Sequence, residues 1–325
     1  MVEHTYRAPA WLPGAHAQTV WPLLIKGPLP AYRRERWETP DDDFIDLDWV
    51  DGDPGAPCVV LFHGLEGSSR SHYARRLMLA TSKRGWHGVV VHFRGCSGEP
   101  NRLPRAYHSG DSQEIDWVLR RLHARGYPAL FAAGVSLGAN ALLKWLAEQG
   151  ALASSVINAA AAVSPPLDLA ASNTALSSGF NLFYARHFLH TLIPAALAKD
   201  RRFPGRIDIR RTQAARTLRD FDDAVTAPLH GFHGADDYYA RSSAGPLLGN
   251  VRTPTLLLHA TNDPFLPAAA LPRREALSSA ITLELLQQGG HVGFVHGPLP
   301  GSIDWMPQRL LAHFGAHFST PTAVR

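Results

Sequence analysis

The hydrophobic positions of this chain first follow a period of two. In the segment Phe44–Val50, apolar side chains alternate with Asp46 and Asp48, which is the pattern of a strand with one buried face. Together with the preceding segment Arg34–Thr39 and the Pro- and Asp-rich connection between them, it predicts an edge hairpin. The alternation places Asp46 and Asp48 on the solvent-facing side, so we interpret them as surface residues and not as metal ligands.

From residue 58 onward the apolar positions form short continuous runs, which predict strands buried on both faces. Segments with helical spacing lie between most of these runs. Strands that alternate with helices predict an α/β fold with a mostly parallel, doubly covered sheet. The predicted strands are Cys58–Phe62, Gly88–Phe93, Ala129–Gly134, Ser155–Val163, Thr255–His259 and Ile281–Leu286. The predicted helices are Ser71–Arg84, Ser112–Arg125, Leu137–Gln149, Ala268–Leu277 and Ile303–Phe318.

The alternation of strands and helices lapses in residues 168–250, which have a helical pattern and no convincing strand. We interpret this stretch as a helical cap inserted over the carboxyl edge of the sheet. Residues 1–167 and 251–325 then form the core. The core begins with an irregular N-terminal segment, residues 1–30, in which a short helix is expected near residues 15–21.

Composition narrows the classes of function. The chain has 325 residues, of which 45% are hydrophobic and 18% charged, enough for a large core. Its net charge of +4 comes from scattered arginines, so we expect no nucleic-acid partner. The first residues lack the apolar stretch of a signal peptide, and the run 156–163 is too short to span a bilayer. Because two cysteines do not make a disulfide framework, we expect a cytoplasmic protein.

Residues 134–138 read Gly-Val-Ser-Leu-Gly, directly between a predicted strand and a predicted helix. This context is typical of a nucleophile elbow, in which a serine occupies a strained turn with its hydroxyl above the sheet. A side chain two residues before or after the serine would collide with the turn, which accounts for Gly134 and Gly138. The pattern therefore predicts Ser136 as a nucleophile.

A serine hydroxyl needs a basic histidine, and that histidine needs an acid that fixes its orientation. With a nucleophile elbow, the acid is expected after a later strand and the base after the last one. Asp263 follows the predicted strand Thr255–His259, and His291 lies in a glycine-rich loop after Ile281–Leu286. We therefore predict Asp263 as the acid and His291 as the base.

Other residues compete for both roles. Asp168 follows the preceding predicted strand and is the alternative acid, whereas Asp236 and Asp237 fall within the cap stretch. His296 is the nearest alternative base. His259 ends a strand beside the acid, so we interpret it as a packed, hydrogen-bonded residue.

A tetrahedral intermediate needs two backbone N–H groups aimed at its oxyanion. One is expected from Leu137, directly after the serine and at the start of a helix whose dipole favours an anion. The second is expected from the loop after Cys58–Phe62, where we choose Leu65. The sequence has no Walker or dinucleotide-binding glycine pattern and no zinc-spaced set of histidines and carboxylates. We therefore expect neither a cofactor nor a metal.

Seven phrases, spread over nearly the whole chain, match one known family. They are His16-Ala-Gln-Thr19, His63-Gly-Leu-Glu-Gly-Ser-Ser69, Arg94-Gly-Cys-Ser-Gly-Glu-Pro-Asn101, Gly134-Val-Ser-Leu-Gly-Ala-Asn140, Phe221-Asp-Asp-Ala-Val-Thr-Ala-Pro228, Asp236-Asp-Tyr-Tyr239 and Gly290-His-Val-Gly293. In these phrases the chain resembles the YheT-type α/β-hydrolases, which are related to the eukaryotic alpha/beta-hydrolase-domain esterases and phospholipases. The resemblance implies an α/β-hydrolase fold, no cofactor, a carboxylic-ester substrate, and a triad at Ser136, Asp263 and His291.

The resulting hypothesis is a serine hydrolase that cleaves carboxylic esters of small-molecule acyl substrates, with short- to medium-chain acyl groups expected. An acyl pocket is expected between the sheet's carboxyl edge and the cap, where Phe180, Leu182, Phe183, Tyr184 and Phe188 line the pocket or form the cap's own core. Two alternatives stay open. One is an acyltransferase or thioesterase with the same triad, and the other is a catalytically silent binding protein of the same fold.

Two acidic pairs in the cap suggest structure more than chemistry. Asp222-Asp223 and Asp236-Asp237 have the composition of an ion site. We interpret them instead as helix caps, or as carboxylates that join the cap to the core through arginines.

Overall fold

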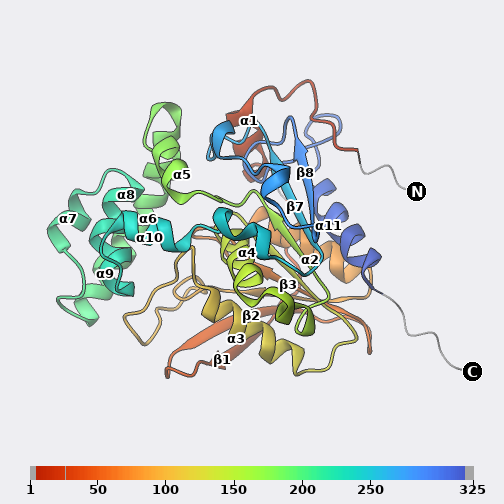
Figure 1. The fold of residues 1–325 in the computed structure, drawn as a ribbon, viewed down its shortest axis with the longest axis horizontal. Helices are drawn as coiled ribbons and strands as arrows, with labels where there is room; N and C mark the ends of the chain where they lie inside the picture. The colour runs from red at the N-terminus through yellow and green to blue at the C-terminus, as the bar shows by residue number, and fades with distance from the viewer. Residues whose placement is uncertain (1–4, 26, 319–325) are drawn as a thin grey trace, which may run out of the picture.

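A single eight-stranded sheet runs through the molecule in the order β1-β2-β4-β3-β5-β6-β7-β8 (Figure 1). The structure is a computed structural model that describes residues 5–25 and 27–318. Strands β3 to β8 are parallel to their neighbours within this set, whereas β1 and β2 pair antiparallel at one edge. The strands are β1 (Arg33–Glu38), β2 (Phe44–Val50), β3 (Cys58–Phe62), β4 (His87–Val91), β5 (Leu130–Val135), β6 (Ala159–Val163), β7 (Thr255–Ala260) and β8 (Ile281–Leu286).

Helices cover both faces of the sheet, which confirms the predicted α/β class. Along β3, the side chains of Val59 and Leu61 pack toward α2 and α11, while Val60 and Phe62 pack toward α3 and α4. This alternation follows from the period of two in a strand, and it makes every strand residue apolar when both faces are covered. The flanking helices are α2 (His72–Lys83), α3 (Ser112–His123), α4 (Leu137–Gln149) and α11 (Trp305–Ala316).

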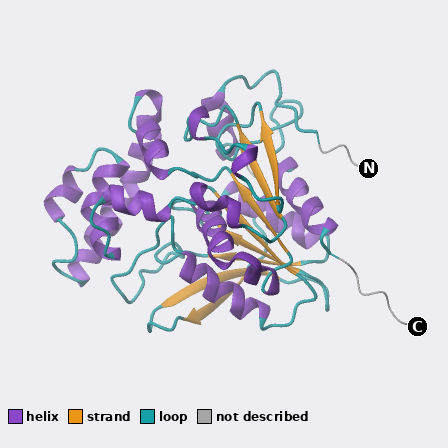
Figure 2. Cartoon of the chain, viewed as in Figure 1, coloured by secondary structure: helices purple, strands orange, loops and turns teal. Residues whose placement is uncertain are grey.

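Between β6 and β7 the chain adds helices and no strand within the described residues. These helices gather to one side of the sheet (Figure 2). They are α5 (Leu169–Leu176), α6 (Leu182–Arg202), α7 (Ile209–Ala214), α8 (Leu218–Phe221), α9 (Ala227–His230) and α10 (Ala235–Ser242), with a π-helical turn at Asp222–Thr226. We call residues 168–250 the cap segment. Before the sheet, α1 (Ala15–Val20) lies where a short helix was expected.

The prediction that Asp46 and Asp48 face solvent is wrong. Both are buried, with 1% and 4% of their surface exposed. Arg36 on the adjacent edge strand β1 donates from Nε to Asp46 Oδ1 at 2.7 Å, and Arg34 donates to Asp48 Oδ1 at 2.7 Å. Asp48 also meets His92 Nε2 at 2.9 Å. The face that the sequence marks as polar is therefore covered by long side chains from a neighbouring strand.

Two predicted elements also differ in the structure. The segment 268–277 is not one helix but two short 3₁₀ turns, Ala268–Ala270 and Arg274–Ala276. Pro272 lies between them, and proline cannot donate the hydrogen bond that a continuous helix needs there. The predicted strand Ser155–Val163 begins only at Ala159, and Ser155 instead ends a 3₁₀ helix formed by residues 150–155.

Among the described residues, no helix combines the length and the apolar character needed to cross a bilayer.

Candidate active site

Ser136 lies in the sharp turn between β5 and α4. Its backbone dihedrals, φ 53° and ψ −119°, are far from the usual regions for a residue with a side chain. A Cβ added to Gly134 would lie 2.5 Å from the Ala139 Cα, and one added to Gly138 would lie 2.4 Å from the His63 carbonyl oxygen. Both glycines are therefore required by close backbone approach, as the collision argument predicts.

The structure brings the three side chains expected to form the triad into one hydrogen-bonded line. His291 Nε2 is 3.0 Å from Ser136 Oγ, and His291 Nδ1 is 2.8 Å from Asp263 Oδ2. Because β5, β7 and β8 are parallel, the loops that follow them meet at the same edge of the sheet. The order of the strands thus joins residues that are remote in sequence. We call this set the Ser136–His291–Asp263 line.

Phe265 fixes two members of this line. Its ring stacks on the His291 imidazole with centroids 4.1 Å apart, and its N–H donates to Asp263 Oδ1 at 2.8 Å. Burial by itself would raise the pKa of Asp263, but attraction and hydrogen bonding to His291 outweigh it and hold this pKa below its ordinary value. The carboxyl group is therefore ionised near neutral pH, as an acid that orients a histidine must be.

The alternative acids and bases lie in other environments. Asp168 caps α5 by accepting from the Ala171 N–H at 2.9 Å. His296 pairs through its backbone with Ser302. His259 is fully buried, with Nδ1 3.0 Å from the Ala260 carbonyl oxygen and Nε2 4.0 Å from Asp263 Oδ2. Burial lowers the pKa of His259, so it is a neutral, packed neighbour of the acid.

The loop after β3 presents one unused N–H near the elbow. The N–H of Gly64 donates to Tyr73 Oη, that of Glu66 to Tyr107 Oη, and that of Gly67 to the Gly64 carbonyl. In the described part of the chain, the Leu65 N–H donates to no such partner. Leu137 is the first residue of α4, where a helix has no acceptor for its N–H groups.

A cavity of about 220 Å³ lies between this edge of the sheet and the cap segment. Ser136, Leu65 and Leu137 form part of its wall. Apolar side chains from the cap segment line it as well, namely Leu176, Phe188, Leu192, Ala196, Leu218, Val225 and Leu229. The polar groups that line it are Glu66, Arg94, His108, Ser172, Lys199, Asp222, His230 and Tyr238, among others.

Of the five aromatic and aliphatic residues expected between 180 and 188, only Phe188 lines this cavity. Phe180 and Phe183 are 58% and 60% exposed. Tyr184 is buried in the cap segment, where its hydroxyl lies 3.1 Å from His16 Nδ1. The helical spacing therefore identifies the cap's packing better than it identifies the pocket.

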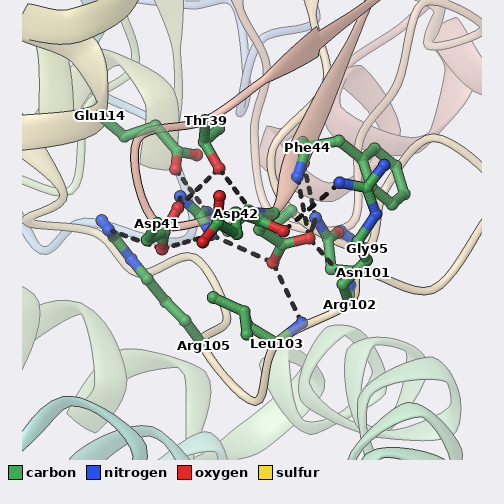
Figure 3. Close-up of polar contacts among 12 residues, drawn as sticks. Thr39, Asp41, Asp42, Phe44, Gly95, Asn101, Arg102, Leu103, Arg105 and Glu114 are labelled. Carbon is green, nitrogen blue, oxygen red and sulfur yellow. Dashed lines mark hydrogen bonds and ion pairs between the residues drawn. The ribbon is translucent and has the colours of Figure 1, made fainter.

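A second polar cluster borders the cavity, and the sequence did not predict it (Figure 3). Arg94 Nη1 meets Asp41 Oδ2 at 2.9 Å and Asp43 Oδ2 at 3.1 Å, and Arg94 Nε meets Glu114 Oε2 at 2.6 Å. Asn101 donates to Asp43 Oδ1 at 2.9 Å. We call these five residues the Asp43–Arg94 cluster. It ties the hairpin turn between β1 and β2 to the loop after β4.

The loop held by this cluster also contacts helix α6 of the cap segment. Lys199 Nζ on α6 donates to the Arg105 carbonyl oxygen at 2.9 Å, and Arg202 Nη1 donates to the Asn101 carbonyl oxygen at 2.6 Å. Burial lowers the pKa of Lys199 to about 8. Basic side chains on backbone carbonyls therefore join α6 to the core.

The acidic pairs of the cap segment join its own helices instead. Asp222 accepts from Thr226 Oγ1 and Tyr239 Oη, and Asp223 accepts from the Ala235 N–H at the start of α10. Asp236 pairs with Arg219, and Asp237 pairs with Arg241 and accepts from the His233 N–H at 3.0 Å. Helix capping is thus found for Asp223, whereas all of these partners lie within the cap segment itself and none in the core. In the described residues, no group of three or more His, Cys, Asp or Glu side chains is arranged to hold a metal.

A strained serine between a strand and a helix, on a mostly parallel sheet with a helical insertion, is the arrangement of the α/β-hydrolase fold. Residues 57–298 match the family model described as alpha/beta hydrolase fold. The chain belongs to the alpha/beta hydrolase family, within the YheT-type group that its sequence phrases indicate.

Its relatives include the putative esterase YheT of Escherichia coli, 41% identical over 91% of this chain and 88% of that protein. The human phospholipase ABHD3 is 30% identical over 94% of this chain and 77% of that protein. Among solved structures, the esterase Pf2001 of Pyrococcus furiosus aligns with a TM-score of 0.53 at 16% identity, covering 88% of this chain and 91% of the other. That structural likeness concerns the fold alone.

Proposed function

We propose that this chain is a serine hydrolase that cleaves carboxylic esters, with Ser136 as nucleophile, His291 as general base and Asp263 as the acid that orients it. The observation that carries the proposal is the line of contacts from Asp263 Oδ2 through the imidazole to Ser136 Oγ, at 2.8 and 3.0 Å. This line ends at the wall of the cavity of about 220 Å³ between the sheet edge and the cap segment.

The chemistry proceeds in two acyl-transfer steps. Ser136 Oγ attacks the ester carbonyl carbon while His291 Nε2 takes the hydroxyl proton. The tetrahedral intermediate collapses to an acyl-serine, and the imidazolium returns that proton to the leaving alkoxide, which departs as an alcohol. Water then attacks the acyl-serine with the same proton transfers, and the free acid leaves. Asp263 stays ionised throughout and stabilises the imidazolium.

The oxyanion of each tetrahedral intermediate is bound, in this proposal, by the N–H groups of Leu65 and Leu137. Two observations support the choice of Leu65: it lines the cavity, and the neighbouring N–H groups of Gly64 and Glu66 already donate elsewhere. The Leu137 N–H lies at the amino end of α4, where the helix dipole favours negative charge. Preorganised donors of this kind contribute about 3–4 kcal/mol to transition-state binding.

The proposed substrates are esters of short- to medium-chain acyl groups. Apolar side chains of the cap segment, among them Leu176, Phe188 and Leu192, line the same cavity as the nucleophile, which suits an alkyl chain. In the proposal, residues 168–250 act as a cap that completes this pocket. The names of the relatives, an esterase and a phospholipase, fit an acyl ester as the reacting group.

Labelling with a fluorophosphonate probe tests the nucleophile directly. Wild type is expected to label, and Ser136→Ala is expected to lose both labelling and ester turnover, by about 10⁴-fold or more. Ser172→Ala is the matched control and is expected to keep probe labelling. Ser172 is a buried serine of the same cavity, and its hydroxyl has no hydrogen-bond partner. An unlabelled wild type would contradict the proposal and favour a silent binding protein.

Hydrolysis of p-nitrophenyl esters of rising chain length tests the substrate class. Turnover is expected to peak at a short or medium acyl chain. Ala196→Phe, which places a large ring at the cavity wall, is expected to move the peak to shorter chains. The same assay with added alcohols or thiols measures acyl transfer. If transfer products predominate, the chain is an acyltransferase and not a hydrolase.

A further inference from the structure

The loop that carries His291 has an unusual backbone. Gly289 and Gly290 have φ values of 147° and 60°, and two residues with side chains follow in the same region, Val292 at 60° and Phe294 at 42°. A positive φ is a genuine outlier for a β-branched residue such as valine. Conformations of this kind persist only where surrounding contacts determine them. Contacts from other segments must therefore hold this loop in place.

Three side-chain oxygens bind three successive N–H groups of the loop. The Gly289 N–H donates to Gln18 Oε1 at 2.9 Å, the Gly290 N–H to Asn262 Oδ1 at 3.0 Å, and the His291 N–H to Thr19 Oγ1 at 2.9 Å. Two of these oxygens belong to α1, in the N-terminal segment. In Figure 1, α1 lies beside the ends of β7 and β8, at the loops that these bonds connect.

Gln18 links both loops that supply the Ser136–His291–Asp263 line. Its Oε1 also accepts from Asn262 Nδ2 at 2.9 Å, and Asn262 is the residue directly before the acid. Its Nε2 donates to the Leu12 carbonyl oxygen and to Gln288 Oε1, both at 3.0 Å. The Gly289 N–H and the Leu12 carbonyl fix which end of the amide is oxygen. Gln18 is completely buried, so these bonds compete little with water.

The fit between α1 and the loop excludes side chains. A Cβ added to Gly293 would lie 2.0 Å from the Gln18 carbonyl oxygen, and one added to Gly290 would lie 2.7 Å from the Thr19 nitrogen. Gln18, Thr19 and Asn262 do not line the cavity, as far as the described residues define it. Their bonds therefore go to the backbone of the loop that carries the base, and not to the space where a substrate binds.

We propose that Gln18 and Thr19 are positioning residues for the base, which hold the loops of His291 and Asp263 in one register. This inference rests on the proposed function. It gives the N-terminal His-Ala-Gln-Thr phrase a role in catalysis that needs no contact with the substrate. Its consequence is specific: the loss of these bonds lowers kcat and leaves KM unchanged, because the His291 imidazole shifts while the apolar wall from the cap segment does not.

Thr19→Val is the decisive variant, because it keeps the shape of the side chain and removes the hydroxyl that accepts from the His291 N–H. We expect kcat to fall by about 10-fold to 100-fold with KM within about twofold of wild type. Thr19→Ser restores the hydroxyl and is expected to regain most of kcat. Gln18→Leu, which removes the link between the two loops, is expected to lose at least as much.

Thr81→Val is the matched control. Thr81 is a buried helical threonine whose hydroxyl donates to the Leu77 carbonyl oxygen at 2.8 Å, four residues back, as that of Thr19 donates to the Ala15 carbonyl oxygen at 2.8 Å. Its replacement is expected to lower Tm like Thr19→Val and to leave kcat unchanged. If Gln18→Leu does not fold, the Thr19 and Thr81 variants still decide the question.

A spectroscopic readout separates positioning from stability. The proton between His291 Nδ1 and Asp263 gives a far-downfield proton NMR resonance when the bond is well aligned. We expect Thr19→Val to weaken or shift this resonance, and Thr81→Val to leave it in place. Wild-type kcat and an unchanged resonance in Thr19→Val and Gln18→Leu would overturn the inference while the esterase proposal stands. A wild type without turnover or probe labelling would overturn both.

Discussion

Two buried polar clusters border the same cavity, and their hydrogen bonding differs. In the Asp43–Arg94 cluster, Asp43 alone accepts from five donors: Arg94, Asn101 and the N–H groups of Phe44, Arg102 and Leu103. In the Ser136–His291–Asp263 line, each member contacts the next through one bond, and the line ends at a hydroxyl on the cavity wall.

This difference separates a structural role from a chemical one. A carboxylate surrounded by donors holds its loop in place and has no remaining capacity to react. In the proposed mechanism, a single file of donor and acceptor leaves the terminal hydroxyl free to attack and lets its proton pass to His291, while Asp263 stays ionised. Burial is common to both clusters, so burial by itself does not indicate which carboxylate takes part in catalysis.

The largest expected effect comes from Asp263→Asn. The amide cannot stabilise the imidazolium and favours the wrong tautomer of His291, so we expect kcat to fall by about 10⁴-fold. Steady-state kinetics on protein shown to be folded by circular dichroism measures it. A loss of kcat smaller than about tenfold would contradict the role of Asp263 as the acid that orients His291.

Asp43→Asn tests the other cluster. The variant leaves Arg94 without one buried partner and turns an amide group toward N–H donors. We expect a loss of about 3–5 kcal/mol in the free energy of unfolding, with kcat per folded molecule unchanged. Denaturant unfolding measures the stability. Asp51→Asn is the control, because its ion pair with Arg33 is exposed and is worth at most about 1 kcal/mol. An equal loss of unfolding free energy in Asp43→Asn and Asp51→Asn would contradict the structural role of the Asp43–Arg94 cluster.

Lys199→Met tests whether the cap segment shapes binding through the loop next to the Asp43–Arg94 cluster. The variant loses the bonds from Nζ to the Arg105 and Leu103 carbonyl oxygens, at 2.9 and 3.4 Å. We expect KM to rise roughly threefold to tenfold with little change in kcat. Arg201→Met, at an exposed position of the same helix, is expected to leave both constants unchanged. A fall in kcat alone would contradict this division of roles.

A further test within the cap segment is the pH dependence of stability. Burial raises the pKa of Asp222 from 3.8 to about 6. The folded state therefore keeps a proton that the unfolded chain loses, and the contribution of Asp222 to stability decreases as pH rises from about 4 to about 6. Asp222→Asn is expected to remove this decrease from a plot of Tm against pH. Parallel curves for wild type and variant would contradict it.

The pKa of Asp43 is shifted in the opposite direction to that of Asp222. Burial would raise its pKa, but bonds from Asn101 and the surrounding N–H groups outweigh burial and lower it. Its contribution to stability is present above pH 3.8 and is lost as pH falls further. The two carboxyls thus differ in titration as well as in their number of donors.

Much of this architecture was predictable because its causes are local. The strand, glycine-bounded turn and helix around Ser136 are specified within residues 130–149, and the period of apolar positions determines which segments form strands. Parallel strand order then places Asp263 and His291 at the same edge. One wrong prediction had the opposite origin, because Asp46 and Asp48 are buried by arginines of a neighbouring strand. The other had a local cause that the helical spacing overrode, since Pro272 divides the expected helix.

By itself, the sequence determined the α/β class, the elbow, and the residues that meet in the Ser136–His291–Asp263 line. Tertiary structure alone decided that Gln18 and Thr19 bind the N–H groups of the His291 loop, and that Arg94 lies among carboxylates. These contacts join segments separated by up to 272 residues, and no local pattern encodes a hydrogen bond whose partner comes from the other end of the chain. Periodicity specifies which face of an element is buried, whereas only packing determines what it is buried against.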